Sequence, residues 1–332
     1  MSETQPPAEP SQASQASQPA PASPAGWRAS RLFAWLQLLR VPNLLTVPGD
    51  PIAGFLLAQA ALGAGTEIPV VRPVMAAIAS VLIYAAGLLW NDLFDLPEDR
   101  RDRPSRPLPS GRVRVGAVKP AAIALTAAAV AAAALANPGR NVLYVVMALG
   151  IVVIAYDWRL KRIPLVGPLA MGCCRGLSVL LGAAVLGPAG LASPPAIAAA
   201  AGITLYVAAV TWLARGETRQ RPVVSQRAAI AAAFVAWLAA VGVSLHLAGR
   251  LDPDWRWAML LLAALATLWL TVCLLNLSGL PEPKTVQRTV GGLILVQATL
   301  VLVNGWAGLN VAIALLLAFL INRRLGRVFY AS

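Results

Sequence analysis

The fold is decided by residues 73–90, which read PVMAAIASVLIYAAGLLW, and by residues 91–99, which continue NDLFDLPED. The first stretch carries no charged side chain and approaches the roughly 20 apolar residues that a helix needs to cross a bilayer. The second stretch is acidic, because the segment from Asp92 to Asp102 holds five of only 14 carboxylates in the 332-residue chain. We therefore predict a membrane helix that carries acidic groups where the membrane meets water.

The composition of the whole chain indicates an all-α, polytopic membrane protein. Hydrophobic residues make up 58% of the sequence and charged residues only 12%, which leaves too little polar surface for a soluble domain. Apolar runs of about the length of a span recur at 43–62, 73–90, 117–135, 141–157, 165–187, 194–213, 227–248 and 257–279. We predict a helical bundle of transmembrane helices.

The number of spans depends on the last apolar region, at about 290–321. It is too long for one span, and Asn304, Gly305 and Gly308 lie in its middle. A single kinked helix would give nine transmembrane helices, and a chain that turns back would give ten. Both alternatives remain open at the level of the sequence.

The formal net charge of +13 comes from basic residues in short loops between the apolar runs. The loops at 91–116, 158–163, 214–227 and 280–289 alternate with poorly charged loops, so the positive-inside rule places them in the cytoplasm. This pattern favours a membrane-embedded role and argues against nucleic acid as a partner. We predict a multi-pass protein of the bacterial inner membrane whose acidic segment faces the cytoplasm.

Three regions differ in composition along the chain. Residues 1–26 are Pro, Ala, Ser and Gln with few large apolar side chains, which is typical of a disordered tail. Residues 27–41 combine an apolar stripe with flanking Arg, which predicts an interfacial amphipathic helix, although a plain extension of the first span is the alternative. Residues 42–330 form the predicted transmembrane domain.

The acidic segment has the spacing of a cation site. On a helix, Asp92, Asp95 and Asp99 are offset by 0, 3 and 7 residues, which places their side chains within about 60° of one face. Carboxylate oxygens suit Mg²⁺, which commonly joins one or two protein carboxylates to phosphate groups of a substrate. Pro97 predicts a kink that would shift Asp99. The alternative is a charged, solvated loop after a membrane helix.

Asn91, Asp92, Asp95 and Asp99, followed by an Arg- and Pro-rich segment at 100–111, resemble the first signature of the UbiA family of intramembrane prenyltransferases. The resemblance covers most of residues 28–330. It implies a Mg²⁺-dependent enzyme that passes a prenyl group from an isoprenyl diphosphate to a small-molecule acceptor beside membrane lipid. The acceptor and the oligomeric state stay open. The implied roles are metal binding by Asp92, Asp95 and Asp99, catalysis by Asp92 and Asp95, and diphosphate binding by Asn91 and Arg106.

Two further segments carry the resemblance. The segment from Tyr156 to Arg162 resembles the Tyr-x-x-x-Leu-Lys-Arg segment of the family, which implies catalysis by Lys161 and substrate binding by Tyr156 and Arg162. A positive-inside anchor is the alternative for these cations. Asn43 and Asp50 resemble polar residues that line the family's cavity.

Arg175 lies near the middle of the fifth apolar run, where an unpaired Arg costs about 2.5–3.5 kcal/mol on insertion scales. It therefore requires a partner. One alternative is a structural ion pair with Asp50, and the other is a role in binding the diphosphate or shaping the cavity.

The second family signature, normally Asp-x-x-x-Asp, should follow the sixth span, but residues 214–221 read ARGETRQR. Glu217 is the single acid there, and Arg219 is one of three Arg around it, so we predict a catalytic role for Glu217 and substrate binding by Arg219. A loop acid that balances the neighbouring Arg is the alternative. The departure resembles the EboC-like branch of the family and leaves open whether one or two Mg²⁺ bind. It also raises a second function, a catalytically weakened UbiA-like scaffold or carrier.

Overall fold

The computed structural model describes residues 30–63, 68–137, 139–215, scattered positions between 228 and 272, 283–302 and 305–329. Within these residues the chain is helical and contains no strand, which confirms the all-α class. The helices are α1 (Arg31–Leu38), α2 (Val41–Leu44), α3 (Gly49–Leu62), α4 (Val71–Asp102), α5 (Val115–Ala136), α6 (Asn141–Trp158), η3 (Leu160–Arg162), α7 (Val166–Ala183), η4 (Ala184–Leu186), α8 (Gly187–Leu191), α9 (Pro194–Ala214), α12 (Pro283–Val301) and α13 (Gly305–Phe329).

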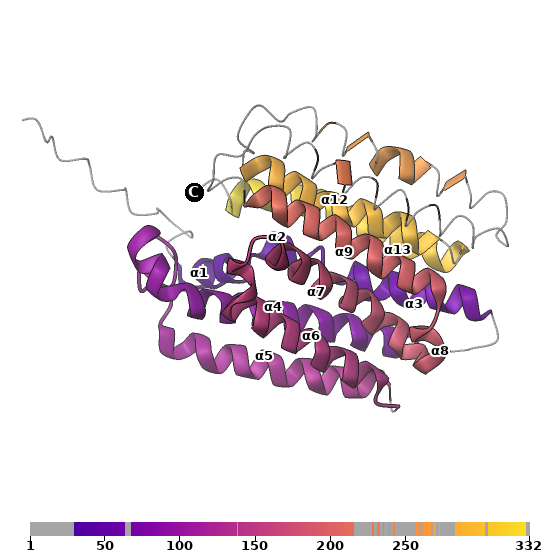
Figure 1. Cartoon of the computed structure of the whole chain (residues 1–332), viewed down its shortest axis with the longest axis horizontal. Helices are drawn as coiled ribbons and strands as arrows, with labels where there is room; N and C mark the ends of the chain where they lie inside the picture. Colours follow the sequence, from indigo (N-terminus) through magenta and orange to yellow (C-terminus); the bar gives the residue numbers. More distant parts are fainter. Residues whose placement is uncertain are drawn as a thin grey trace, which may run out of the picture.

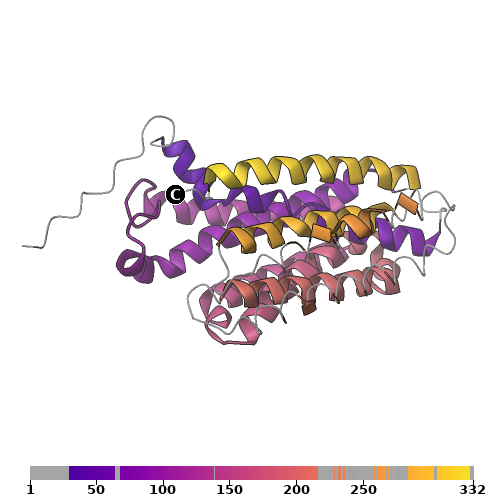
Figure 2. The ribbon, with the colours of Figure 1, turned by 90° about the horizontal axis from the view of Figure 1, so that it is seen from above.

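The long helices lie side by side in one bundle (Figures 1 and 2). Helices α4, α5 and α6 form one side, α9, α12 and α13 form the other, and α3 and α7 lie between them. Small residues permit the close approach of α7 and α9, because a Cβ atom at Gly172 or Gly176 would collide with the backbone or side chain of Thr204. The main core joins α3, α7, α9, α12 and α13 through buried Leu, Ile, Val and Ala side chains.

Seven segments of the described chain are long and apolar enough to cross a membrane. Six of them coincide with the first six predicted runs, and the seventh is Gly308–Gly326 in α13. The predicted spans at 227–248 and 257–279 fall largely outside the described residues. The total of nine or ten therefore stays a prediction.

The region at 290–321 is two antiparallel helices. Gly291 lies against Asn322, and Gly308 lies against Val301 and Leu302, so α12 and α13 run side by side in opposite directions. Gly305, at φ +58°, begins α13 in a left-handed conformation that glycine adopts without steric cost. The chain thus turns back here, as the second of the two sequence alternatives requires.

Two local predictions concern helix ends. Within residues 27–41 a helix spans Arg31–Leu38, and its N-cap Ser30 accepts a 3.1 Å hydrogen bond from the Phe33 amide. Its place at a membrane surface remains a prediction. Helix α4 continues through Pro97 to Asp102, and the kink at this proline stays a prediction.

Candidate active site

Three carboxylates of α4 each lie beside a cation from another part of the chain. Arg40 Nη2 lies 3.5 Å from Asp92 Oδ1, Lys161 Nζ lies 2.6 Å from Asp95 Oδ1, and Arg106 Nη1 lies 2.7 Å from Asp99 Oδ2. Asp92 and Asp99 are buried, whereas Asp95 is half-buried. The spacing of 0, 3 and 7 residues thus places the acids where basic groups from three different segments reach them. These six residues are called the acid–cation cluster below.

Lys161 has two partners on α4. Its ammonium donates to Asn91 Oδ1 at 3.0 Å and to Asp95 Oδ1 at 2.6 Å. The short 3₁₀ helix η3 turns the chain directly after α6 and directs the lysine toward α4. The resemblance that selected Asn91, Asp95 and Lys161 has therefore selected groups that are in contact.

Arg40 reaches Asp92 from an unusual backbone conformation. Its φ of 44° and ψ of 53° are left-handed, which costs a non-glycine residue about 1 kcal/mol or more. Such conformations persist where the surrounding structure fixes them, and they concentrate at functional sites. No motif in the sequence marks Arg40 as a site residue, because only the fold brings the chain after α1 beside α4.

A cluster of buried apolar residues packs around the part of α4 that carries the acid–cation cluster. Leu89 and Leu96 of α4 pack with Ala34 and Leu38 of α1, with Leu108 and Val113 of the loop after α4, and with Val118 and Ala122 of α5. This packing holds the loop that carries Arg106 against α4. Ser110 Oγ donates to the Arg106 carbonyl at 2.7 Å and closes a turn in the same loop.

Asp157, the penultimate residue of α6, is a further acid at this end of the bundle. It is 4% exposed, and its Oδ2 has no hydrogen-bond partner among the described residues. Of the charged side chains, Lys161 and then Asp95 interact with it most strongly. Asp157 was not among the predicted site residues, unlike its neighbour Tyr156, although it is the single carboxylate of the apolar run at 141–157.

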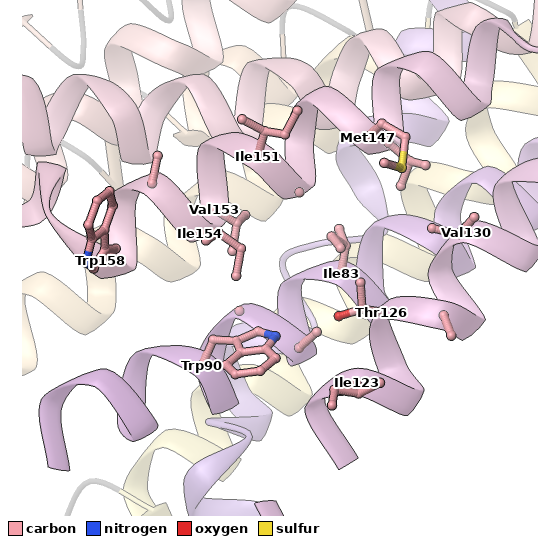
Figure 3. A pocket seen from close by; sticks show the side chains of 16 residues that line it. Ile83, Trp90, Ile123, Thr126, Val130, Met147, Ile151, Val153, Ile154 and Trp158 are labelled. Atoms are coloured by element: carbon pink, nitrogen blue, oxygen red, sulfur yellow. The ribbon is translucent and has the colours of Figure 1, made fainter. Parts of the chain in front are cut away.

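An apolar cavity of about 690 Å³ lies between α4, α5 and α6. Trp90 and Trp158 flank one end and Met147 and Val130 the other, as Figure 3 shows. Thr126 and the two indole nitrogens are the polar groups among its otherwise apolar lining. Since Trp90 precedes Asn91 and Trp158 follows Asp157, the cavity ends beside the charged residues. Its volume lies within the range of about 300–1,000 Å³ that is typical of small-molecule sites.

Asp50 and Arg175 form the buried ion pair that the sequence analysis raised as one alternative. Arg175 Nε lies 2.8 Å from Asp50 Oδ2, and both side chains are almost fully buried. Gln297 donates to Asp50 Oδ1 at 2.6 Å and to the Thr46 carbonyl at 2.8 Å, and Arg175 Nη2 also donates to that carbonyl. This network joins α3, α7 and α12 inside the bundle.

The remaining predicted residues occupy different environments. Tyr156 is half-buried on α6, and Asn43 is half-buried in α2, where its carbonyl accepts a 2.7 Å bond from Thr46 Oγ1. Arg162 is exposed and makes no ion pair with a described carboxylate. Glu217 and Arg219 lie outside the described residues. Their roles stay predictions, as does the likeness to the EboC-like branch.

The start of the segment at 214–221 can be located through Arg215. Its Nη1 donates to the carbonyls of Ile163 and Pro164 at 3.0 and 3.1 Å. The end of α9 therefore lies against the loop that follows Lys161. This contact places Arg215, in the segment at 214–221, at the same end of the bundle as Lys161.

The donor set fits a hard divalent ion. It consists of carboxylate and amide oxygens, which Mg²⁺ prefers, and the buried Oδ2 of Asp157 lacks a partner. Across the described parts of the chain no three acidic, His or Cys side chains are gathered closely enough to hold a metal as they stand. Side chains of the ion pairs would have to rearrange around an ion.

The fold and the site together define a polytopic helical membrane protein in which three acid–cation pairs lie beside an apolar cavity. The chain belongs to the UbiA prenyltransferase family, whose model matches residues 52–278. This match confirms the resemblance seen in the acidic segment.

Relatives of known name and solved structures agree with the family. The chain is 31% identical over 160 residues to digeranylgeranylglyceryl phosphate synthase of Methanosarcina barkeri (46% of this chain, 55% of the relative) and 35% identical over 152 residues to that of Methanopyrus kandleri (46% and 53%). It thus spans about half the length of these relatives. The fold matches that of a UbiA homolog from Aeropyrum pernix with a TM-score of 0.57 and 20% identity, over 82% of this chain and 98% of that chain. It also matches a UbiA homolog from Archaeoglobus fulgidus bound to DMAPP and Mg²⁺, with a TM-score of 0.57 and 16% identity, over 82% of this chain and 99% of that chain.

Proposed function

We propose that this protein is a Mg²⁺-dependent intramembrane prenyltransferase that transfers a prenyl group from an isoprenyl diphosphate to a small-molecule acceptor. The observation that carries the proposal is the acid–cation cluster at the end of an apolar cavity. A diphosphate needs cations and a prenyl chain needs an apolar surface. The site offers both, side by side.

The roles of the residues follow from their chemistry. Asp92, Asp95 and Asp99 would hold Mg²⁺, which when bound supplies concentrated positive charge between the carboxylates and the diphosphate oxygens. Lys161 and Arg106 would bind the remaining phosphate oxygens, as would Arg40. Negative charge grows on the diphosphate as its bond to the prenyl carbon breaks, so fixed cations stabilise the transition state more than the ground state.

The apolar cavity would protect the reacting carbon. When the carbon–oxygen bond breaks, the prenyl group becomes an allylic cation that must bond to the acceptor before water reaches it. The acceptor nucleophile then loses its proton, which the released diphosphate can take up. Trp90 and Trp158 flank the end of the cavity that is adjacent in sequence to Asn91 and Asp157, so the diphosphate would lie at that end and the prenyl chain between α4, α5 and α6.

The acceptor and the membrane orientation belong to the same proposal. The names of the archaeal relatives make a lipid glycerol phosphate one acceptor to test. The basic loops favour the inner membrane of a bacterium, with the site facing the cytoplasm. A cysteine at Ser110 should then react with a membrane-impermeant maleimide in lysed cells and not in intact ones, in a background without the native cysteines.

The proposal is tested by calorimetric binding of geranylgeranyl diphosphate to the purified protein in detergent, with and without Mg²⁺. Asp92→Asn should weaken Mg²⁺-dependent binding about tenfold or more, because it removes a charged oxygen from the site. Glu98→Gln, on the exposed face of the same segment, is the matched control and should bind as the wild type does. Equal binding by all three proteins, or binding that ignores Mg²⁺, contradicts the proposal and favours a scaffold or carrier.

A further inference from the structure

Asp157 is a buried acid without a counter-charge in contact. Its side chain is 4% exposed, its Oδ2 has no hydrogen-bond partner, and it forms no ion pair with a residue in the described ranges. Burying a carboxylate in this state is costly unless a cation or hydrogen-bond donors compensate it. Lys161, the charged group that acts on Asp157 most strongly, already donates to Asn91 and Asp95.

The position of Asp157 is fixed by the packing of α6 against α4. Gly87 faces Val153, and Lys161 reaches Asn91 and Asp95, so the two helices advance in the same direction, and α4 continues beyond the end of α6. A Cβ atom at Gly87 would lie 2.6 Å from Val153 Cγ1 and 4.0 Å from Asp157 Oδ2. The absence of a side chain at Gly87 therefore lets α6 bring Asp157 against α4, one turn before Asn91.

The charges around Asp157 belong to the acid–cation cluster. Lys161, Asp95, Arg40 and Asp92 are the charged groups that act on its carboxylate, in that order of strength. They come from α1–α2, α4 and η3. The unpartnered oxygen thus lies against α4 at Gly87, one turn before Asn91, and three of these four charged groups belong to α4 or η3.

We propose that Asp157 is a ligand, directly or through a metal-bound water, of a divalent cation held between α4 and α6 together with Asn91 and Asp95. The inference rests on the proposed function, since it concerns the same cation. Mg²⁺ keeps several waters and needs only a few protein oxygens, so two helices suffice. Asp157 would supply from α6 an acidic ligand that the segment at 214–221, with its single Glu217, lacks relative to the usual signature.

The test measures Mn²⁺ binding to the full-length protein in detergent, without diphosphate, by electron paramagnetic resonance of the free ion. Asp157→Asn keeps the shape of the side chain and removes its charge, and should weaken Mn²⁺ binding about tenfold or more. Asp102→Asn removes the same charge at an exposed position of α4 and should stay within about twofold of the wild type. Asp157→Ala, measured in parallel, should behave as Asp157→Asn does.

Thermal unfolding supplies a second test, because the unfolding temperature of the metal-free variant should change in opposite directions if Asp157 is a metal ligand and if it is a purely structural acid. Without metal, Asp157→Asn should unfold at a higher temperature than the wild type, because an uncompensated buried charge is gone. With Mn²⁺, the rise in unfolding temperature should be smaller in the variant than in the wild type.

The two proposals fail in different ways. Wild-type Mn²⁺ affinity in Asp157→Asn together with weak binding in Asp95→Asn overturns the role of Asp157 and leaves the metal site on α4. Wild-type affinity in both variants overturns the metal site as a whole. A lower unfolding temperature of metal-free Asp157→Asn would also count against the ligand role, because it would show that the carboxylate serves the packing of the bundle.

Discussion

The ammonium of Lys161 lies 2.6 Å from the carboxylate of Asp95, although 66 residues separate them in the chain. The same ammonium contacts Asn91, one turn earlier on α4. A single positive charge thus occupies the space between two oxygen donors that are proposed to hold a metal ion. Lys161 therefore has two roles to separate by experiment, as a competitor of the metal and as a ligand of the diphosphate.

Lys161→Met should separate these roles by effects of opposite sign. Without diphosphate, the variant should bind Mn²⁺ more tightly than the wild type, because no ammonium competes for Asp95 and Asn91. Its affinity for an isoprenyl diphosphate in saturating Mg²⁺ should fall by about tenfold or more, the loss expected for one charge-assisted hydrogen bond of about 1.5–3 kcal/mol. Both affinities can be measured by calorimetry.

Arg159→Met is the matched control for this prediction. Arg159 is exposed, two residues from Lys161, and its removal changes the net charge by the same amount. Its two affinities should match those of the wild type. A fall of both affinities in Lys161→Met would show that the lysine supports the structure of the site rather than competing with the metal.

Much of the fold and part of the site could be predicted from the sequence, because they depend on local patterns. The length of apolar runs sets the spans, and the spacing of Asp92, Asp95 and Asp99 follows from the period of the helix. The partner of Arg175 could also be named, since Asp50 is the other charge within an apolar run. The length of a span, the period of a helix and the need to pair a buried charge can each be applied directly to residue positions in the sequence.

The contributions of Arg40 and Asp157 depend on tertiary packing and were missed for that reason. Arg40 reaches Asp92 through a left-handed backbone conformation that no sequence pattern marks at an Arg. Asp157 approaches α4 because Gly87 leaves room for α6. The division of residues 290–321 into α12 and α13 likewise depends on where the chain turns at Gly305, which the apolar pattern alone leaves open.

The ion pair of Asp50 and Arg175 should stabilise the bundle through mutual compensation. Arg175→Met leaves a buried carboxylate without its cation and should cost about 3–5 kcal/mol of unfolding free energy. The double change Asp50→Leu with Arg175→Met removes both charges and should recover at least half of that loss. Thermal unfolding in detergent measures the stability of the wild type, of Arg175→Met and of the double variant.

The double variant also distinguishes a structural role of the ion pair from a role of Arg175 in substrate binding. If the pair is purely structural, the double variant should bind isoprenyl diphosphate in Mg²⁺ as the wild type does. A stable double variant that has lost this binding would assign Arg175 to the diphosphate, the other alternative raised by the sequence. A double variant less stable than Arg175→Met would contradict the proposed compensation.

The apolar cavity should determine which prenyl chains bind. Gly150 lies in its wall, eight residues or about 12 Å along α6 from Trp158, at the usual helical rise of 1.5 Å per residue. A Cβ atom at Gly150 would meet only Ile83 Cδ1, at 3.6 Å, so a side chain can enter the cavity without displacing backbone. Gly150→Leu should therefore shorten the space for the chain from the far end while leaving the charged end intact.

The expected result is a change in selectivity. Gly150→Leu should bind geranyl diphosphate within about twofold of the wild type and geranylgeranyl diphosphate about tenfold more weakly, since the atoms of the longer chain that no longer fit lose about 0.8 kcal/mol per CH₂ left unburied. Gly116→Leu, in the first turn of α5 where a Cβ atom meets nothing within 4 Å, is the control and should leave both affinities unchanged. Competition binding in Mg²⁺ measures the ratio. Equal losses for the two diphosphates would show that the change disturbs the polar end, and unchanged affinities would place the prenyl chain outside the cavity between α4, α5 and α6.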